Sequence, residues 1–163
     1  MKRLFIPAAA AAAVLVFAVV NAGARGGHHG NGHGNGHGLT VVEHAATDAV
    51  TNGDASTDKL GNALTFANPV YDQADQTRVG SDQGYCIRVV LGSSWECNWT
   101  TFLPKGQITV EGPFSDTGNT TLAITGGTGA YRDARGSMDL KYHNPAGTKF
   151  DFVFNLHGNG DHD

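Results

Sequence analysis

The sequence LAITGGTGAYRDARG, residues 122–136, combines three closely spaced glycines with an aromatic residue and two arginines. A phosphate-binding loop requires Gly-x-x-x-x-Gly-Lys-Ser/Thr, and a dinucleotide-binding turn requires Gly-x-Gly-x-x-Gly at the start of a helix. Arg132 stands where the third glycine of the second motif belongs, and the following residues, GSMDLKYH, alternate with period two instead of beginning a helix. The stretch therefore predicts no nucleotide site, and its role depends on the rest of the chain.

Similar alternating segments occur on both sides of this stretch. In TKFDFVFNL, residues 148–156, Phe150, Phe152, Phe154 and Leu156 share one face, as expected for a half-buried strand. The sequence predicts eight strands, around residues 39–45, 64–66, 85–91, 95–103, 108–110, 122–124, 137–142 and 148–156. Eight strands with mostly short connections favour a closed antiparallel β-barrel, because closure removes exposed sheet edges; a β-sandwich is the alternative.

Composition excludes one class of partner. The chain of 163 residues carries 11 basic and 15 acidic side chains, a net charge of −4. Nothing in it would neutralise a row of phosphates, so we expect no binding of nucleic acid. No sequence motif indicates a cofactor, and we expect none.

The first 24 residues are typical of a secretory signal. Lys2 and Arg3 precede an apolar run that ends at the small-residue site Ala22-Gly23-Ala24, with no stop-transfer charges behind it. We therefore expect cleavage after Ala24, a secreted protein, and no membrane contact once the signal is removed. The domain prediction is a signal at 1–24, a tail at 25–38 and a folded domain at 39–163.

The tail RGGHHGNGHGNGHG, residues 25–38, has no apolar side chain to bury and is predicted to be disordered. Imidazole binds Zn²⁺, Ni²⁺ and Cu²⁺, so its histidines are candidates for loose metal binding: His28, His29, His33 and His37. Glycine on every side provides no fixed ligand geometry, and we therefore predict no tight metal site.

Two cysteines lie in neighbouring predicted strands. Cys86 is in YCIRVVL and Cys97 in WECNWTTFL, with the turn Gly92-Ser93-Ser94 between them. In an exported protein such a pair usually forms a disulfide across the hairpin. Two separate buried thiols are the alternative.

Several segments resemble the allene oxide cyclase and dirigent protein superfamily. The closing half of that fold resembles GQITVEGPF (106–114), LAITGGTGAYRDARGSMDL (122–140) and KFDFVFNL (149–156); LGNALTFANPVYD (60–72) and VGSDQGYC (79–86) extend the likeness upstream. The resemblance covers about residues 41–156. It implies an eight-stranded antiparallel barrel of lipocalin-like shape and a homotrimer formed through the outer barrel face. Gly126, Gly127 and Gly129 would then form a loop where positive φ or close backbone approach excludes a Cβ.

The resemblance implies two chemistries. Allene oxide cyclases are isomerases that close a fatty-acid epoxide inside the barrel, using a first-strand Glu and a water held by a nearby Asn. Glu43 corresponds to that acid, but Ala45 stands where the Asn is expected. Dirigent proteins steer the coupling of phenolic intermediates, and their Asp-Asp-Pro reads Ala67-Asn68-Pro69 here. The candidate catalytic residues are Glu43, Asn68 and Arg135, the last of which could instead pair with Asp133.

These observations lead to two hypotheses. In the first, an exported barrel binds a small hydrophobic or polycyclic ligand in its interior and guides isomerisation or cyclisation. Its candidate ligand-binding residues are Phe66, Tyr85, Trp95, Trp99, Phe150, Phe152 and Phe154. In the second, the protein is a secreted binding or structural module without catalysis, and its histidine tail binds metal weakly. A filled interior favours the second hypothesis. Glu43 either faces solvent or lies in the cavity with a raised pKa.

Overall fold

The computed structural model describes residues 37–51 and 58–157. The predicted signal and all but the last two residues of the predicted tail lie outside the described residues, and so do His28, His29 and His33. The first strand begins at His37, two residues before the start predicted for the folded domain.

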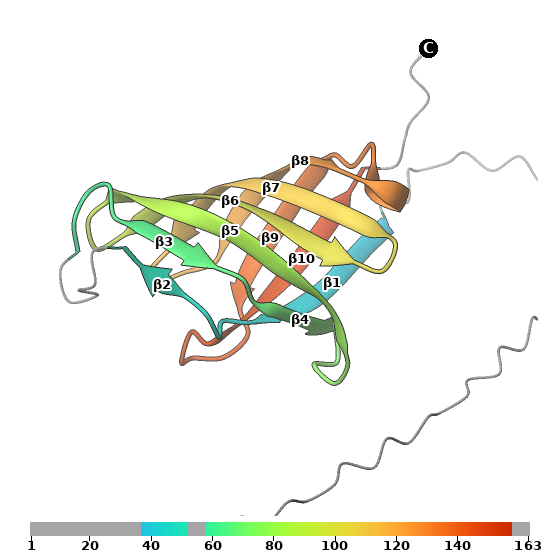
Figure 1. Ribbon diagram of the computed structural model, residues 1–163, viewed down its shortest axis with the longest axis horizontal. Helices are drawn as coiled ribbons and strands as arrows, with labels where there is room; N and C mark the ends of the chain where they lie inside the picture. The colour runs from blue at the N-terminus through green and yellow to red at the C-terminus, as the bar shows by residue number, and fades with distance from the viewer. Residues whose placement is uncertain (1–36, 52–57, 158–163) are drawn as a thin grey trace, which may run out of the picture. The chain divides into compact units, whose positions relative to one another are not determined.

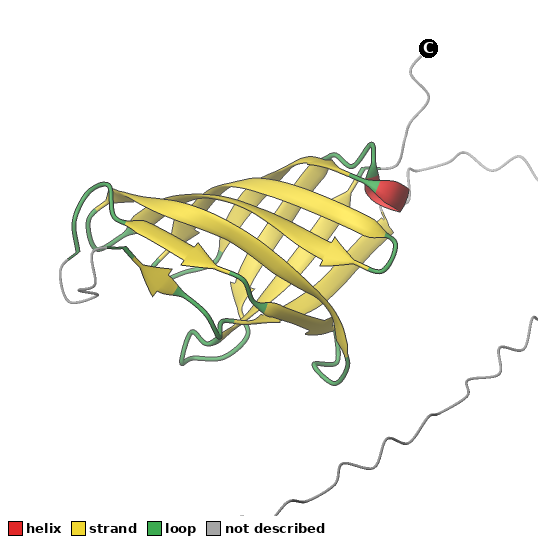
Figure 2. Ribbon diagram, viewed as in Figure 1, coloured by secondary structure: helices red, strands yellow, loops and turns green. Residues whose placement is uncertain are grey.

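Ten β-strands and one short 3₁₀ helix make up the described part of the chain (Figure 1, Figure 2). They are β1 (His37–His44), β2 (Ala49–Val50), β3 (Ala63–Phe66), β4 (Pro69–Asp72), β5 (Arg78–Val90), β6 (Ser94–Leu103), β7 (Gly106–Ser115), β8 (Thr120–Gly127), η1 (Gly129–Tyr131), β9 (Gly136–Tyr142) and β10 (Lys149–Leu156). No helix within residues 37–51 and 58–157 is long and apolar enough to cross a membrane.

The strands close into a ring in which every described pairing is antiparallel. β1 pairs with β10, and the order continues through β9, β8, β7 and β6 to β5, which returns to β1 through β4. β3 and β4 pair with successive parts of β5, so together they fill one strand position. The ring therefore has eight positions, and the predicted eight-stranded antiparallel barrel is confirmed.

Two adjacent strand positions of the ring are each interrupted, and the two interruptions lie side by side. The first position is divided between β1 and β2, and the second between β3 and β4. β1 pairs with β4 and β2 pairs with β3, so the interruption at residues 45–48 lies beside the one at residues 67–68. β4 was not among the predicted strands, and β5 begins at Arg78, well before its predicted start at Tyr85.

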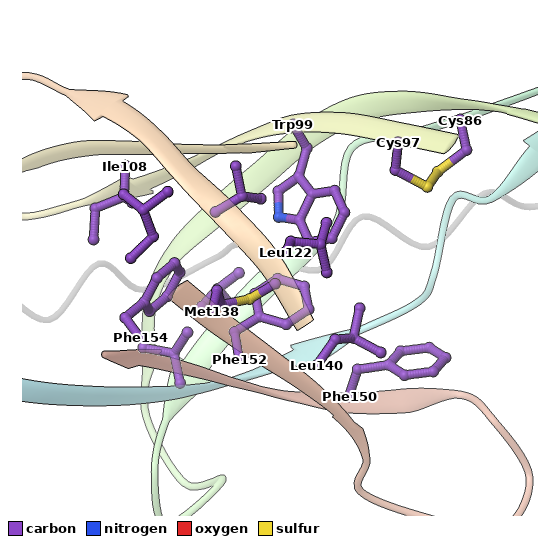
Figure 3. Close-up of a cluster of buried hydrophobic side chains, with 14 of the residues drawn as sticks. Cys86, Cys97, Trp99, Ile108, Leu122, Met138, Leu140, Phe150, Phe152 and Phe154 are labelled. Atoms are coloured by element: carbon purple, nitrogen blue, oxygen red, sulfur yellow. A yellow bond between two sulfur atoms is a disulfide. The ribbon is translucent and has the colours of Figure 1, made fainter. Parts of the chain in front are cut away.

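The barrel interior is packed with the apolar faces that the period-two pattern predicted. Figure 3 shows a part of this core, in which Trp99 lies above Phe152, with their ring centroids 5.4 Å apart. The buried apolar residues of the later strands are Ile108, Val110, Leu122, Ile124, Met138, Leu140, Phe150, Phe152 and Phe154. Burial of each large side chain contributes about 1.5–3 kcal/mol.

The glycines of the opening stretch serve the connection from β8 to β9. A Cβ on Gly127 would lie 2.2 Å from the Tyr131 carbonyl oxygen and 2.5 Å from that of Gln107. Gly129 has a φ of +61°. The prediction that glycine is required is wrong for Gly126, where the nearest atom to an added Cβ would be 3.4 Å away.

The predicted disulfide is present. Cys86 on β5 lies directly opposite Cys97 on β6, and their sulfur atoms are bonded. Figure 3 shows the disulfide beyond the Trp99 ring, at one end of the core cluster. Both sulfur atoms lie on the inner face of the barrel wall.

Candidate functional site

A cavity of about 50 Å³ lies inside the barrel beside Trp99. Its wall is apolar except for two carboxyl groups. The lining residues are Glu43, Asp48, Leu64, Phe66, Cys86, Cys97, Trp99, Phe114, Leu140, Phe150 and Phe152. An apolar cavity with a few placed polar groups is the usual form of a small-molecule site.

Glu43 enters this cavity because of its place on β1. Alternate residues of a strand face opposite sides of a sheet, and Glu43 shares the inner side with the buried core residue Val41. Its neighbours across the two adjoining pairings are Phe150 and Val70. The residue is 6% exposed. Glu43 therefore faces inward, and the solvent-facing alternative does not hold.

Asn68 connects the two interrupted strand positions. Its side-chain Oδ1 accepts hydrogen bonds from the backbone N–H groups of Ala46 and Thr47, both at 2.9 Å. Its Nδ2 donates to Glu43 Oε1 at 2.7 Å and to Asp48 Oδ1 at 2.8 Å. One amide thus fixes the loop between β1 and β2 and orients the Glu43 carboxyl.

Asp82 on β5 lies on the other side of Asn68. The two residues exchange backbone hydrogen bonds of 3.1 and 2.9 Å, and Asp82 Oδ1 also accepts from the Asn68 backbone N–H at 3.1 Å. The side chain is 1% exposed. The side chains of Glu43 and Asp82 are also hydrogen-bonded to each other. The site therefore contains a pair of buried carboxyl groups in contact, with the Asn68 amide beside them.

Burial changes the titration of both groups, because it disfavours the charged form. Burial raises the pKa of Glu43 to about 7; the hydrogen bond from Asn68 opposes this rise, and the charge of Asp48 adds to it. Burial, with the charge of Glu43 as the next cause, raises the pKa of Asp82 to about 9. Because the two carboxyl groups share a hydrogen bond, they titrate as a pair. Near neutral pH the pair holds a proton that it can release or regain, the property needed of a general acid or base.

Arg135 does not belong to this site. It follows the β8–β9 connection and precedes Gly136, whose partner on β10 is Leu156, whereas Glu43 pairs with Phe150 near the other end of that strand. Its guanidinium donates to the Ala134 carbonyl oxygen at 2.7 Å. The suggested partner Asp133 bonds to Arg132 instead.

The seven aromatic candidates divide into two groups. Four line the cavity: Phe66, Trp99, Phe150 and Phe152. Phe154 is buried in the core outside the cavity wall. Trp95 donates its Nε1–H to Asp116 at 3.0 Å and lies 3.9 Å from the guanidinium carbon of Arg88. Tyr85 is 51% exposed. The expectation that these last three residues line the cavity is therefore wrong.

Sequence reasoning missed Asp82 and Asp48, as well as the lining residues Leu64, Phe114 and Leu140. A signal for Asp82 existed. Counting back from Cys86 in steps of two along the strand gives Gly84 and then Asp82, so all three lie on the inner face. The run GSDQG around it resembles a turn and concealed this periodicity.

No cluster of three or more His, Cys, Asp or Glu side chains suited to a metal ion occurs among residues 37–51 and 58–157.

The fold and the site define a closed antiparallel barrel with a buried carboxyl in a small interior cavity. Residues 43–162 match the family model of allene oxide cyclase, and the chain belongs to this family.

Solved structures with related folds have several activities. A pyocyanin demethylase is 23% identical with a TM-score of 0.59, over 71% of this chain and 98% of its own. A pterocarpan synthase dirigent protein is 18% identical with a TM-score of 0.62, over 78% and 87%. An exo-specific intermolecular Diels-Alderase is 20% identical with a TM-score of 0.53, over 76% and 100%. At these identities the likeness concerns the fold alone.

Proposed function

We propose that this protein binds a small, largely apolar molecule in the barrel cavity and that Glu43 transfers a proton during its isomerisation or cyclisation. The observation that carries the proposal is a buried carboxyl with a pKa of about 7 in an otherwise apolar wall. The named activities of similarly folded proteins, a dirigent pterocarpan synthase and a Diels-Alderase, support this reaction class.

Cavity size restricts the ligand. One water needs roughly 10–15 Å³ by this measure, and pockets that enclose drug-sized molecules hold roughly 300–1,000 Å³. A cavity of about 50 Å³ therefore accepts a single small ring or the end of a hydrocarbon chain. A polycyclic ligand would keep part of its ring system outside the wall.

Charge restricts the ligand further. The lining contains Glu43 and Asp48 but no Lys or Arg. A bound carboxylate would meet carboxyl groups with no cation to compensate for the loss of solvation. We infer that the ligand is neutral or positively charged, in contrast to the fatty-acid substrate that the family resemblance implies.

The test begins with native mass spectrometry of the protein isolated from its producing cells, which identifies a small molecule that co-purifies. Glu43→Gln keeps the side-chain shape and removes the titrating group. Turnover of the identified molecule should fall on the order of 10²–10⁴-fold, with little change in its affinity. Glu96→Gln on the exposed face of β6 is the matched control and should retain full turnover. Unchanged turnover in Glu43→Gln, with the fold intact, would reject the catalytic role.

The close packing of the interior favours the second candidate function, a binding module without catalysis. If the co-purified molecule remains chemically unchanged after prolonged incubation, and both variants bind it equally, this function replaces the first.

We also propose that the protein is exported and forms a homotrimer. The disulfide supports export, because disulfides persist in oxidising compartments. Intact-mass analysis should show a chain that begins at Arg25, and light scattering should give three times the mass of one chain.

A further inference from the structure

Five buried side-chain polar atoms of the described residues make no hydrogen bond of normal geometry, and three of them belong to neighbouring residues on β5 and β6. They are Asp82 Oδ2, Trp99 Nε1 and Thr101 Oγ1. Asp82, Trp99 and Thr101 are 1%, 3% and 0% exposed. Buried polar groups in proteins are nearly always hydrogen-bonded, so Trp99 Nε1 and Thr101 Oγ1 require a partner. The Asp82 carboxyl is hydrogen-bonded to Glu43 and has lone pairs left to accept a further bond.

The three residues are neighbours in the barrel wall. Thr101 on β6 lies directly opposite Asp82 on β5, where side chains on one face are about 4.5–5.5 Å apart at Cβ. Trp99 precedes Thr101 by two positions and shares its inward face. Thr101 is also opposite Ile108. Figure 3 shows the indole nitrogen on the side of the Trp99 ring toward Ile108 and away from the disulfide.

The chemistry of the three groups is complementary to one molecule. The Trp99 N–H can only donate, the Thr101 hydroxyl can donate or accept, and the Asp82 carboxyl can accept or, when protonated, donate. None of the three satisfies another. A water molecule has two donors and two acceptors, and a buried water typically makes about three hydrogen bonds.

We propose that Asp82, Trp99 and Thr101 together hold a buried water molecule. Hydrogen bonds through this water would connect the carboxyl groups of Glu43 and Asp82 with the Thr101 hydroxyl. The water would lie on the side of the Trp99 ring that faces away from the disulfide. This water site does not depend on the proposed ligand, because Trp99 Nε1 and Thr101 Oγ1 lack partners among the described residues whether or not the cavity is occupied.

A crystal structure of the protein at a resolution that shows ordered water is the direct test. The expected result is a density peak about 2.7–3.2 Å from all three atoms. Direct hydrogen bonds among the three groups, the absence of a peak, or density for a larger molecule would overturn the proposal.

Variants provide a second measurement. Thr101→Val removes the hydroxyl at nearly constant shape and should abolish the peak, whereas Thr101→Ser should keep it. Thr100→Val, the adjacent position on the outer face of β6, is the matched control and should also keep the peak.

The chain contains two tryptophans, so its ¹H–¹⁵N spectrum should contain two indole signals. Thr101→Val should shift the Trp99 indole signal and leave that of Trp95 in place, because Trp95 Nε1 bonds to Asp116. An unshifted Trp99 signal in a folded Thr101→Val protein would contradict the proposal, independently of any measurement of catalysis.

Discussion

The Asn68 side chain both accepts and donates hydrogen bonds, which an ionised carboxylate could not do. It accepts from backbone N–H groups through Oδ1 and donates to Glu43 and Asp48 through Nδ2. An ionised Asp can only accept, so at this position it would face two further carboxyl groups without a donor. An amide at position 68 therefore matches its neighbours, which present two backbone donors and two carboxyl acceptors.

We predict that Asn68→Ala lowers the free energy of unfolding by about 2–4 kcal/mol, because it leaves buried donors and acceptors unpaired. Asn68→Asp should also be destabilising at neutral pH, and less so in acid, where its carboxyl is protonated. Chemical denaturation measures both effects.

Asn98→Ala is the control for this prediction. Asn98 lies half-buried on the outer face of β6 and makes no side-chain hydrogen bond to the described residues. Its replacement should change stability by no more than about 0.5 kcal/mol. Equal effects of Asn68→Ala and Asn98→Ala would show that the amide does not hold the two strand breaks together.

At the scale of elements, the adjacent glycines Gly126 and Gly127 at the end of β8 differ in how closely other atoms surround them. Gly127→Ala would place a methyl group against two backbone carbonyl oxygens, whereas Gly126→Ala would not. We predict a loss of about 2 kcal/mol or more for Gly127→Ala. Gly126→Ala should be neutral or slightly stabilising, since it restricts the unfolded chain. Thermal unfolding of the two variants distinguishes them, and similar melting temperatures would contradict the assignment.

Strands with clear period two were predictable from the sequence, and those that depend on tertiary contacts were not. β10 places Phe150, Phe152 and Phe154 on one face, and the opposite face is mostly polar, so its inner face was evident. β4 has four residues and begins with Pro69, which removes a backbone donor and suggests a turn. It pairs only because β5 and β1 lie on either side.

The residues of the candidate site also differ in how far the sequence could predict them. Glu43 was recognised as a candidate acid, but its inward orientation was not predictable, because Val41 and Val42 make both faces of its strand apolar. Asp82 was not recognised, since a charged residue in a glycine-rich run normally indicates a surface turn. Its burial depends on Asn68, which the pairing of β4 with β5 brings next to it, and this pairing was not predicted.

For the whole molecule, the buried acids predict a stability that depends on pH. A carboxyl whose pKa is higher in the folded state holds its proton while the unfolded chain has released it, so stability falls as the pH rises between the two pKa values. For Glu43 this range runs from 4.5 to about 7, and for Asp82 from 3.8 to about 9. The free energy of unfolding should therefore decline across these ranges.

Glu43→Gln should remove the part of this decline that lies between pH 4.5 and 7. Each pKa unit corresponds to about 1.4 kcal/mol, so above pH 7 the variant should be more stable than the natural protein by on the order of a few kcal/mol. At pH 4 the two should be nearly equal. Urea denaturation across this range measures the difference, and Glu96→Gln should follow the natural curve. Parallel curves for Glu43→Gln and the natural protein would show that the Glu43 carboxyl is not desolvated.

The pairing of β1 with β10 has a consequence for how the protein is made. The ring cannot close until the ribosome has released the last strand, because the first strand lacks one of its two neighbours until then. Contacts between segments so distant in sequence also form slowly. If the protein is exported, as we propose, this delay keeps the nascent polypeptide unfolded, which is the form in which a chain can pass through a narrow translocation pore.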